Sequence, residues 1–335
     1  MTKEASNRIY WIRLICAVMV VGIHSENGLA FQLPADSISW KIQAWITNNI
    51  YCVAVPIFFI LSGFFCFYNK DEKQIMNRYG NRVRKTAYLY LLWNVLYTIY
   101  YYIKQVMYFQ CLPKMNMTDI LKGIFLYAHN YPWWFMLQLL IYEILTPVFL
   151  FCIKEKRRVV YVYCVALLLI LLRQMNIFLL PYFNEASFLW YFTGIVAGVY
   201  KSDILLKESK LDIYIGMAMI VISEAALNME WIYKDDIIRD ILILIVAMGI
   251  LVLSKTIKCK GSIPENWKNS FFIYATHPVI VGNITLIEKS VLNVGEKSSF
   301  ILFLINPILV IGIIYIILLV TKKIGLYSLL TAENM

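Results

Sequence analysis

Apolar residues form runs that recur along most of the chain. Nearly all of these runs are about 17 to 23 residues long, enough to cross roughly 30 Å of hydrocarbon as a helix at 1.5 Å per residue. With 61% of its residues apolar and 16% charged, the chain is too apolar for one soluble domain, so the lipid bilayer is its expected solvent. The predicted fold is an all-α polytopic membrane protein with about ten transmembrane helices, at residues 9–30, 48–68, 86–105, 133–153, 159–177, 187–200, 211–229, 238–254, 270–288 and 299–321.

A membrane β-barrel is not expected. Segments 241–245 and 311–320 are almost continuously apolar, whereas a barrel strand alternates apolar and polar residues. The run at 187–200 is short and holds Gly194 and Gly198, so the helix count has a margin of one. No loop is long enough to form a folded domain, and residues 1–335 are predicted to be one transmembrane domain with no appended soluble domain.

Lys and Arg residues crowd the loops after the second, fourth, sixth and eighth runs and the segment after the tenth. The loops on the opposite side hold roughly half as many. The positive-inside rule therefore predicts that both termini are cytoplasmic. Because these residues lie next to helix ends, the net charge of +10 needs no nucleic-acid partner.

Several well-known chemical signatures are missing from the chain. The seven cysteines form no CxxC pair, which argues against a disulfide framework and a zinc site, and no metal is expected. There is also no P-loop, GxSxG, HExxH or GxGxxG motif. ATP-driven pumping, lipase-type hydrolysis and a Rossmann cofactor thus have no support in the sequence.

Arg13 and His24 are the two most informative polar residues of the first run. Eleven residues separate them, so they share one helix face about 16 Å apart along the axis. A charge in hydrocarbon is costly, which favours Arg13 facing a polar interior, and His24 is a candidate general base. In the alternative interpretation Arg13 reaches the inner headgroups and His24 lies at the outer interface. The two interpretations have about even weight from spacing alone.

His277 and Glu143 are further polar residues inside predicted spans. Pro278 directly follows the histidine and favours a kink or local opening of the helix there, which suits either a binding cavity or a structural hydrogen bond. A carboxylate in the fourth span needs a cation or a proton, and pairing of Glu143 with Arg13 or His24 is conceivable.

Two surface segments also have a functional and a plain interpretation. Arg78, Arg82, Arg84 and Lys85 stand at the inner end of the third span, where they suit either a phosphorylated ligand or ordinary anchoring to anionic lipid. The aromatic segment 131–135 suits a sugar-stacking platform or an interfacial belt.

Five segments, in order, resemble the acyltransferase 3 family of bacterial integral membrane acyltransferases. They are an Arg-x10-His first helix at 7–24, VPIFFILSGF at 55–64, a W-x-L to P segment at 134–147, a glycine-containing helix at 192–198 and Y-x-x-H-P at 273–278. Each motif alone is weak. Together they span nearly the whole chain.

The resemblance implies ten helices in the cytoplasmic (inner) membrane of a bacterium. It also implies that an acyl group, most often acetyl, moves from cytosolic acyl-CoA to a hydroxyl of an extracytoplasmic acceptor, with a cell-surface glycan expected. The family needs the Arg and His that correspond to Arg13 and His24. Its basic RxxR motif corresponds to Arg82 and Lys85, but the second arginine is lysine here and a usual nearby proline is Tyr88. A homodimer is left open.

The expected site follows from both lines of reasoning. Its residues are His24, Arg13 and Glu143 for catalysis; Arg78, Arg82, Arg84 and Lys85 for acetyl-CoA as acyl donor; and His277, Trp134 and Tyr274 for substrate. His24 is expected to deprotonate the acceptor or to accept the acyl group briefly.

The main alternative is a transporter or flippase of a small molecule or a lipid-linked sugar, which would use the same polar residues as a binding path. The membrane half of membrane-bound serine racemases also resembles this family and is thought to deliver serine. Against transport, the chain shows no clear inverted repeat. A third interpretation is a structural subunit of a polysaccharide assembly complex.

Overall fold

The fold is a bundle of helices, and the described residues contain no β-strand. A computed structural model describes residues 1–109, 116–177, 182–229, 236–259, 264–268 and 270–334. Its principal helices are α1 (Lys3–His24), α2 (Ile38–Trp45), α3 (Ala54–Phe67), α4 (Glu72–Phe109), α5 (Met117–Leu126), α6 (Trp134–Ile144), α7 (Thr146–Ile153), α8 (Lys156–Gln174), α9 (Glu185–Tyr200), α10 (Asp203–Leu206), α11 (Asp212–Leu227), α13 (Asp236–Ser254), α14 (Ser270–Val291), α15 (Glu296–Lys323) and α16 (Tyr327–Thr331).

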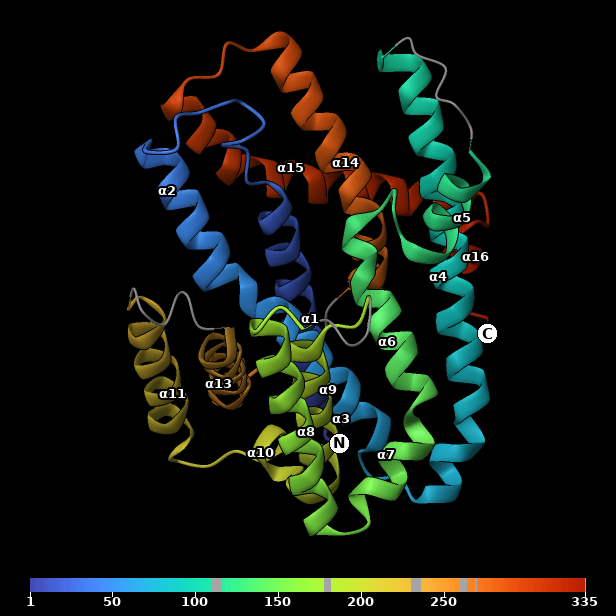
Figure 1. Cartoon of the computed structure of the whole chain (residues 1–335), viewed down its shortest axis with the longest axis vertical. Helices are drawn as coiled ribbons and strands as arrows, with labels where there is room; N and C mark the ends of the chain where they lie inside the picture. The colour runs from blue at the N-terminus through green and yellow to red at the C-terminus, as the bar shows by residue number, and fades with distance from the viewer. Residues whose placement is uncertain (110–115, 178–181, 230–235, 260–263, 269, 335) are drawn as a thin grey trace.

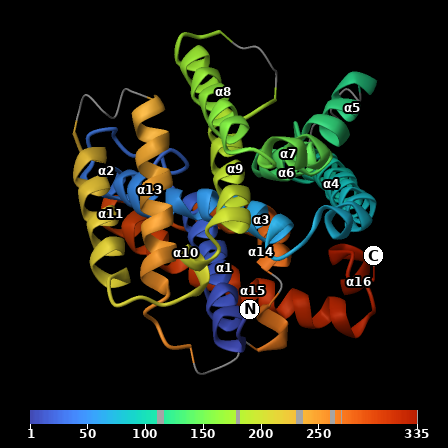
Figure 2. The ribbon, with the colours of Figure 1, turned by 90° about the horizontal axis from the view of Figure 1, so that it is seen from below.

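The arrangement places α1 in the middle of the molecule. In Figures 1 and 2, α4, α5 and α6 lie to one side of α1, and α11 and α13 lie to the other. Helix α15 crosses obliquely behind α14 in Figure 1. The short helix α16 lies beside α4, where Tyr88 and Trp93 donate side-chain hydrogen bonds to the carbonyls of Leu329 (3.3 Å) and Leu330 (3.0 Å).

Each of the ten predicted runs overlaps a helix, and the run at 133–153 overlaps both α6 and α7, so the all-helical fold is confirmed. By length and composition, five helices can cross a membrane: Lys3–His24, the continuous stretch Ile38–Phe67, Ile237–Ser254, Ser270–Val291 and Glu296–Lys323. The pair Tyr131–Ile144 and Thr146–Ile153, bent by 58°, is a sixth if it counts as one span. The chain is thus a multi-pass membrane protein, while ten spans and two cytoplasmic termini stay predictions.

Two boundaries differ from the predicted ones. The first helix ends at His24 and not at residue 30, because Ser25 caps it with a backbone hydrogen bond to Gly22 (3.1 Å). The second begins well before residue 48, since α2, a π-helical turn at Ile46–Ile50, a 3-10 turn at Tyr51–Val53 and α3 run on without a break. Residues 25–37 form the turns between these two helices.

The basic segment predicted as a cytoplasmic loop at 69–85 is mostly helical. Helix α4 starts at Glu72 and is 38 residues long, or about 57 Å at the α-helical rise. Asp71 and Gln74 form a reciprocal capping box at its start: the Gln74 N–H donates to the Asp71 carboxylate (2.7 Å) and the Asp71 N–H to the Gln74 side chain (3.3 Å). The basic residues therefore stand on a rigid helix that leads into the bundle.

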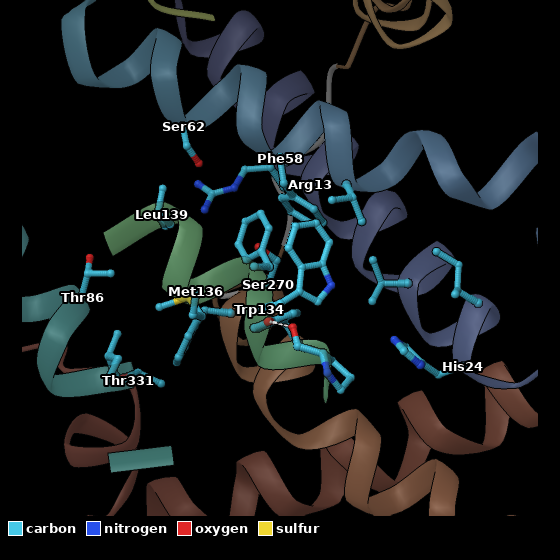
Figure 3. Close-up of a pocket in the computed structure, with 18 of the residues that line it drawn as sticks. Arg13, His24, Phe58, Ser62, Thr86, Trp134, Met136, Leu139, Ser270 and Thr331 are labelled. Carbon is cyan, nitrogen blue, oxygen red and sulfur yellow. Dashed lines mark hydrogen bonds between the residues drawn. The ribbon is translucent and has the colours of Figure 1, made fainter. Parts of the chain in front are cut away.

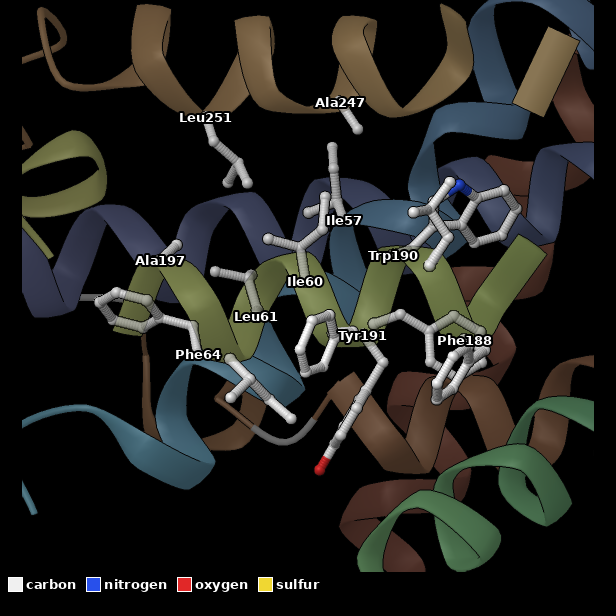
Figure 4. Close-up of a cluster of buried hydrophobic side chains, with 14 of the residues drawn as sticks. Ile57, Ile60, Leu61, Phe64, Phe188, Trp190, Tyr191, Ala197, Ala247 and Leu251 are labelled. Carbon is white, nitrogen blue, oxygen red and sulfur yellow. The ribbon is translucent and has the colours of Figure 1, made fainter. Parts of the chain in front are cut away.

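The closest helix packing is between α3 and α9. A Cβ atom added at Gly63 would stand 2.2 Å from the carbonyl oxygen of Tyr191, and one at Gly194 would stand 2.1 Å from that of Ile60. These glycines let the two backbones touch, as small residues do between membrane helices. Figure 4 shows the apolar side chains of α3 and α9 interlocked beneath α13, with Ala247 and Leu251 facing them.

Candidate active site

A partly open cavity of about 450 Å³ lies between α1, α3, α4, α6 and α14. Arg13 and His24 both line it, as one-face spacing predicted, together with Val20 between them. The predicted site residues Lys85, Trp134 and Tyr274 line it as well. The remaining lining residues are Ile23, Val55, Phe58, Ser62, Thr86, Leu89, Tyr131, Pro132, Phe135, Met136, Leu139, Ser270, Phe271 and Thr331.

The two ends of the cavity differ in chemistry. Figure 3 shows Arg13, Ser62 and Thr86 on one side and His24 on the opposite side, with Trp134 between them. The Arg13 guanidinium points toward Ser62, and no hydrogen bond or ion pair joins it to another described residue. With Lys85 beside Thr86 on α4, this end carries positive charge and hydroxyl groups suited to an anionic ligand. The wall between the ends is mainly apolar, as in most small-molecule sites.

A buried hydrogen-bond network fixes the chain directly after His24. The Asn27 backbone N–H donates to Gln43 (3.1 Å), while the Asn27 amide donates to the Ser299 carbonyl (3.1 Å) and accepts from the Ser299 hydroxyl (2.6 Å). The Gln43 amide in turn donates to the Ser299 hydroxyl (2.9 Å). This network ties α1 to α2 and α15, so the end of α1 that carries His24 is held on two sides.

His277 lies next to His24 although 253 positions separate them in the chain. The centroids of the two imidazole rings are 5.0 Å apart and their planes are inclined by 40°. His277 is fully buried and does not line the cavity, so the structure places it behind His24 and away from the ligand space. Its predicted role in substrate binding is not supported by this position.

Comparison with known proteins identifies the family of the chain. The family described as "Acyltransferase domain", acyltransferase 3, matches residues 7–322. The chain belongs to the acyltransferase 3 family. The resemblance carried by the five motifs is thus confirmed, and the helices that can cross a membrane agree with a multi-pass membrane protein.

One curated relative is similar to part of the chain. An amino-acid racemase of Enterococcus faecalis is 29% identical over 167 residues, which is 49% of this chain and 22% of the racemase. The chain therefore corresponds to about a fifth of that relative's length, and racemase activity is not transferred to it. No solved structure matches the chain.

Glu143 pairs with Arg82, and not with Arg13 or His24. The Arg82 guanidinium lies 3.1 Å from the Glu143 carboxylate and also donates to the Cys66 sulfur. Neither Arg82 nor Glu143 lines the cavity, and the side chain of Glu143 is 8% exposed. The pair joins α4 to α6 beside α3, which is a structural position.

The basic cluster is divided by the helical geometry of α4. Lys85 lines the cavity, Arg82 is occupied by Glu143, and Arg78 and Arg84 are exposed outside the cavity. Positions 78, 82 and 85 are spaced to share one helix face and position 84 is not, so helix geometry sets Arg84 apart while the pairing with Glu143 sets Arg82 apart. Of the predicted donor-binding residues, only Lys85 meets the cavity that holds His24.

The aromatic residues at the mouth of the cavity fall into two groups. Tyr131 is 75% exposed, and Trp134 lines the cavity. Trp133 is fully buried and stacks on Tyr274 with ring centroids 5.1 Å apart. The Tyr274 hydroxyl donates to the Pro132 carbonyl, which locks α14 against the start of α6.

Other polar residues of the spans also have structural partners or separate places. Arg173 pairs with Asp240 (2.6 Å) and Glu185 (3.7 Å), and Glu224 lines a second, smaller groove beside α11. Residues not expected from the sequence are Asn27, Gln43 and Ser299, which hold the end of α1, and the cavity hydroxyls of Ser62 and Thr86. Their only sequence signal is that they are polar residues within or next to apolar runs.

We expect Glu143→Leu to destabilise the protein by about 1 to 3 kcal/mol, below the range for fully buried pairs, because it leaves the partly buried Arg82 charge without its partner. The double variant Arg82→Met with Glu143→Leu should recover most of this loss, since a hydrophobic pair needs no desolvation. Thermal unfolding in detergent, followed by tryptophan fluorescence, measures both. A catalytic Glu143 would give the opposite pattern: normal stability and lost transfer in the single variant, with no recovery in the double.

Proposed function

We propose that this acyltransferase moves an acyl group, acetyl in the first instance, from cytosolic acyl-CoA to a hydroxyl of an extracytoplasmic acceptor. The observation that carries the proposal is the single cavity that holds Arg13 at one end and His24 at the other. The two residues are about 16 Å apart along α1, a distance that an extended pantetheine arm can bridge. The proposed acceptor is a cell-surface glycan. The proposed location of the protein is the cytoplasmic membrane of a bacterium.

The polar end of the cavity is proposed to receive the anionic part of the donor. Arg13 and Lys85 supply positive charge there, and the Ser62 and Thr86 hydroxyls supply hydrogen bonds. Guanidinium and ammonium groups are the usual partners of phosphate oxygens. The apolar wall around Trp134 then guides the uncharged arm and its thioester toward His24.

At the other end, His24 is proposed to act as general base. Its unprotonated ring nitrogen takes the proton of the acceptor hydroxyl as the oxygen attacks the thioester carbonyl. A C–O bond forms, the C–S bond breaks, and the departing CoA sulfur recovers the proton from the imidazolium. The products are an O-acyl ester and free CoA, so atoms and protons balance without a metal or redox cofactor.

The test is transfer by the purified protein in nanodiscs given acetyl-CoA with a radiolabelled acetyl group. We expect free CoA to be released and the label to appear on a glycan acceptor. When the acceptor is omitted, water takes its place and the label should appear as acetate. Arg13→Gln should raise the KM for acetyl-CoA, because the charge at the donor end is lost. If no acyl transfer is detected with any acceptor and a labelled solute is taken up into proteoliposomes, the transporter alternative is favoured.

A further inference from the structure

The protonation of His277 is fixed by its backbone neighbours. Its Nδ1 atom lies 2.7 Å from the carbonyl oxygen of Tyr274 and 3.3 Å from that of Ile273. A carbonyl only accepts hydrogen bonds, so Nδ1 must carry the proton. Pro278 has no N–H to give to the Tyr274 carbonyl four positions before it, and the imidazole donates to that oxygen instead. The His-Pro pair thus locks His277 in one tautomer.

The opposite nitrogen of this ring is then left with a lone pair. Nε2 of His277 is buried and has no hydrogen-bond partner among the described residues. A buried acceptor without a partner costs about 1 to 3 kcal/mol, so its presence in a packed core needs a reason. The ring contact of His277 with the shorter centroid distance is that with His24 on α1, at 5.0 Å, against 6.0 Å for Tyr274.

No hydrogen bond joins the two rings among the described residues, but their spacing brings one within reach of a small ring rotation. Two imidazoles joined by an N–H···N bond of about 2.9 Å have centroids about 5 Å apart, and the observed separation is 5.0 Å. In the described part of the chain no hydrogen bond or ion pair joins a carboxylate to either ring. His24 also lines the cavity.

We propose that His277 is a positioning residue whose Nε2 accepts the N–H of His24, which fixes the tautomer of His24 that presents an unprotonated nitrogen to the cavity. The inference rests on the proposed function for its catalytic meaning and on geometry alone for the contact. When His24 takes the proton of the acceptor, His277 holds the second N–H of the imidazolium. The neutral imidazole of His277 thus accepts the hydrogen bond of the imidazolium in place of a buried carboxylate. Desolvating a carboxylate in the membrane interior would be costly.

A matched pair of variants separates the two bonds that His277 makes. In His277→Asn, the shorter amide can still donate to the Tyr274 carbonyl but does not reach His24. In His277→Gln, the longer amide places an oxygen near the position of Nε2 and can accept from His24. We expect the Asn variant to lose about 10- to 100-fold in kcat, the range for partners that orient a functional imidazole, and the Gln variant to recover part of it. The KM for acetyl-CoA should not change in either variant.

Nitrogen NMR of histidine-labelled protein reads the contact without any activity. The chain has only three histidines, and the third, His129, is assigned by its loss in His129→Phe. In the wild type we expect His277 to be protonated at Nδ1 alone, and a coupling across the hydrogen bond to join its Nε2 to a ring nitrogen of His24. His277→Asn should turn the single His24 tautomer into a mixture.

The outcomes are decisive in each direction. The proposal is overturned if the wild-type spectrum shows a protonated Nε2 on His277 or lacks the coupling. This result does not depend on whether any variant folds. An Asn variant with wild-type kcat, or with a raised KM at unchanged kcat, also overturns it, the latter in favour of substrate binding. If the wild type transfers no acyl group, the proposed function fails while the NMR result still decides the contact.

Discussion

Replacing His24 by Ala is expected to lower acyl transfer from acetyl-CoA by about 100- to 10,000-fold, the usual contribution of a general base. The protein should still fold, because His24 is the last residue of α1 and the Asn27 network holds that end of the helix without it. Release of free CoA by the purified variant in nanodiscs is the measurement. The monodispersity of the sample on gel filtration checks the fold.

His129→Phe is the matched control for this experiment. His129 lies outside the cavity and stacks on Tyr101 with ring centroids 4.1 Å apart, a contact that a phenyl ring can keep. Transfer by this variant should equal that of the wild type. Unchanged transfer in His24→Ala with its expression intact would remove His24 from the mechanism and with it the proposed route of the acyl group.

The second large effect is expected at the contact between α3 and α9. Gly194→Val should prevent folding, since even a Cβ atom would stand 2.1 Å from the Ile60 carbonyl oxygen and backbone atoms cannot move aside as a flexible side chain can. Gly194→Ala should cost roughly 3 kcal/mol or more, at the upper end of overpacking penalties. Separation of α3 from α9 would also displace Phe58 and Ser62, which line the cavity.

Gly312→Ala is the control, because nothing lies within 4 Å of a Cβ atom at this position of α15. Replacing Gly by Ala in an exposed helix should leave stability equal or slightly higher. Yields of monodisperse protein from membranes and thermal unfolding in detergent compare the variants. A Gly194→Val protein that is as abundant and as stable as Gly312→Ala would show that the close contact of α3 and α9 is not required.

Much of the helical framework was predictable, and the boundaries that were wrong depend on local capping. The apolar runs mark helices because backbone groups in a bilayer must bond within their own segment. The start of α4 was predicted as a loop because hydropathy does not mark capping residues. The capping box of Asp71 and Gln74 is a local signal of a different kind, a pair of polar residues three positions apart. The continuous helix from Ile38 to Phe67 was missed because its first part is too polar to be taken as a span.

The candidate site was predicted in part. The spacing of Arg13 and His24 placed them on one face, and the cavity now lies along that face. The pairing of Arg82 with Glu143 could not be read from the chain, since 61 positions separate them and several other partners had the right charge. The tertiary contacts of α4 similarly divided the basic cluster, with Arg82 on Glu143 and Lys85 at the cavity.

What the sequence alone determined is the solvent, the helical fold, the family and the choice of His24 as the candidate base, because these depend on composition, periodicity and motifs within single segments. Only the tertiary structure decided which polar residues meet, because pairs such as His24 and His277 are far apart in the chain and become neighbours through the packing of α1 against α14. His277 therefore changes from a candidate ligand-binding residue to a neighbour of the proposed base, and Glu143 from a candidate catalytic group to the partner of Arg82.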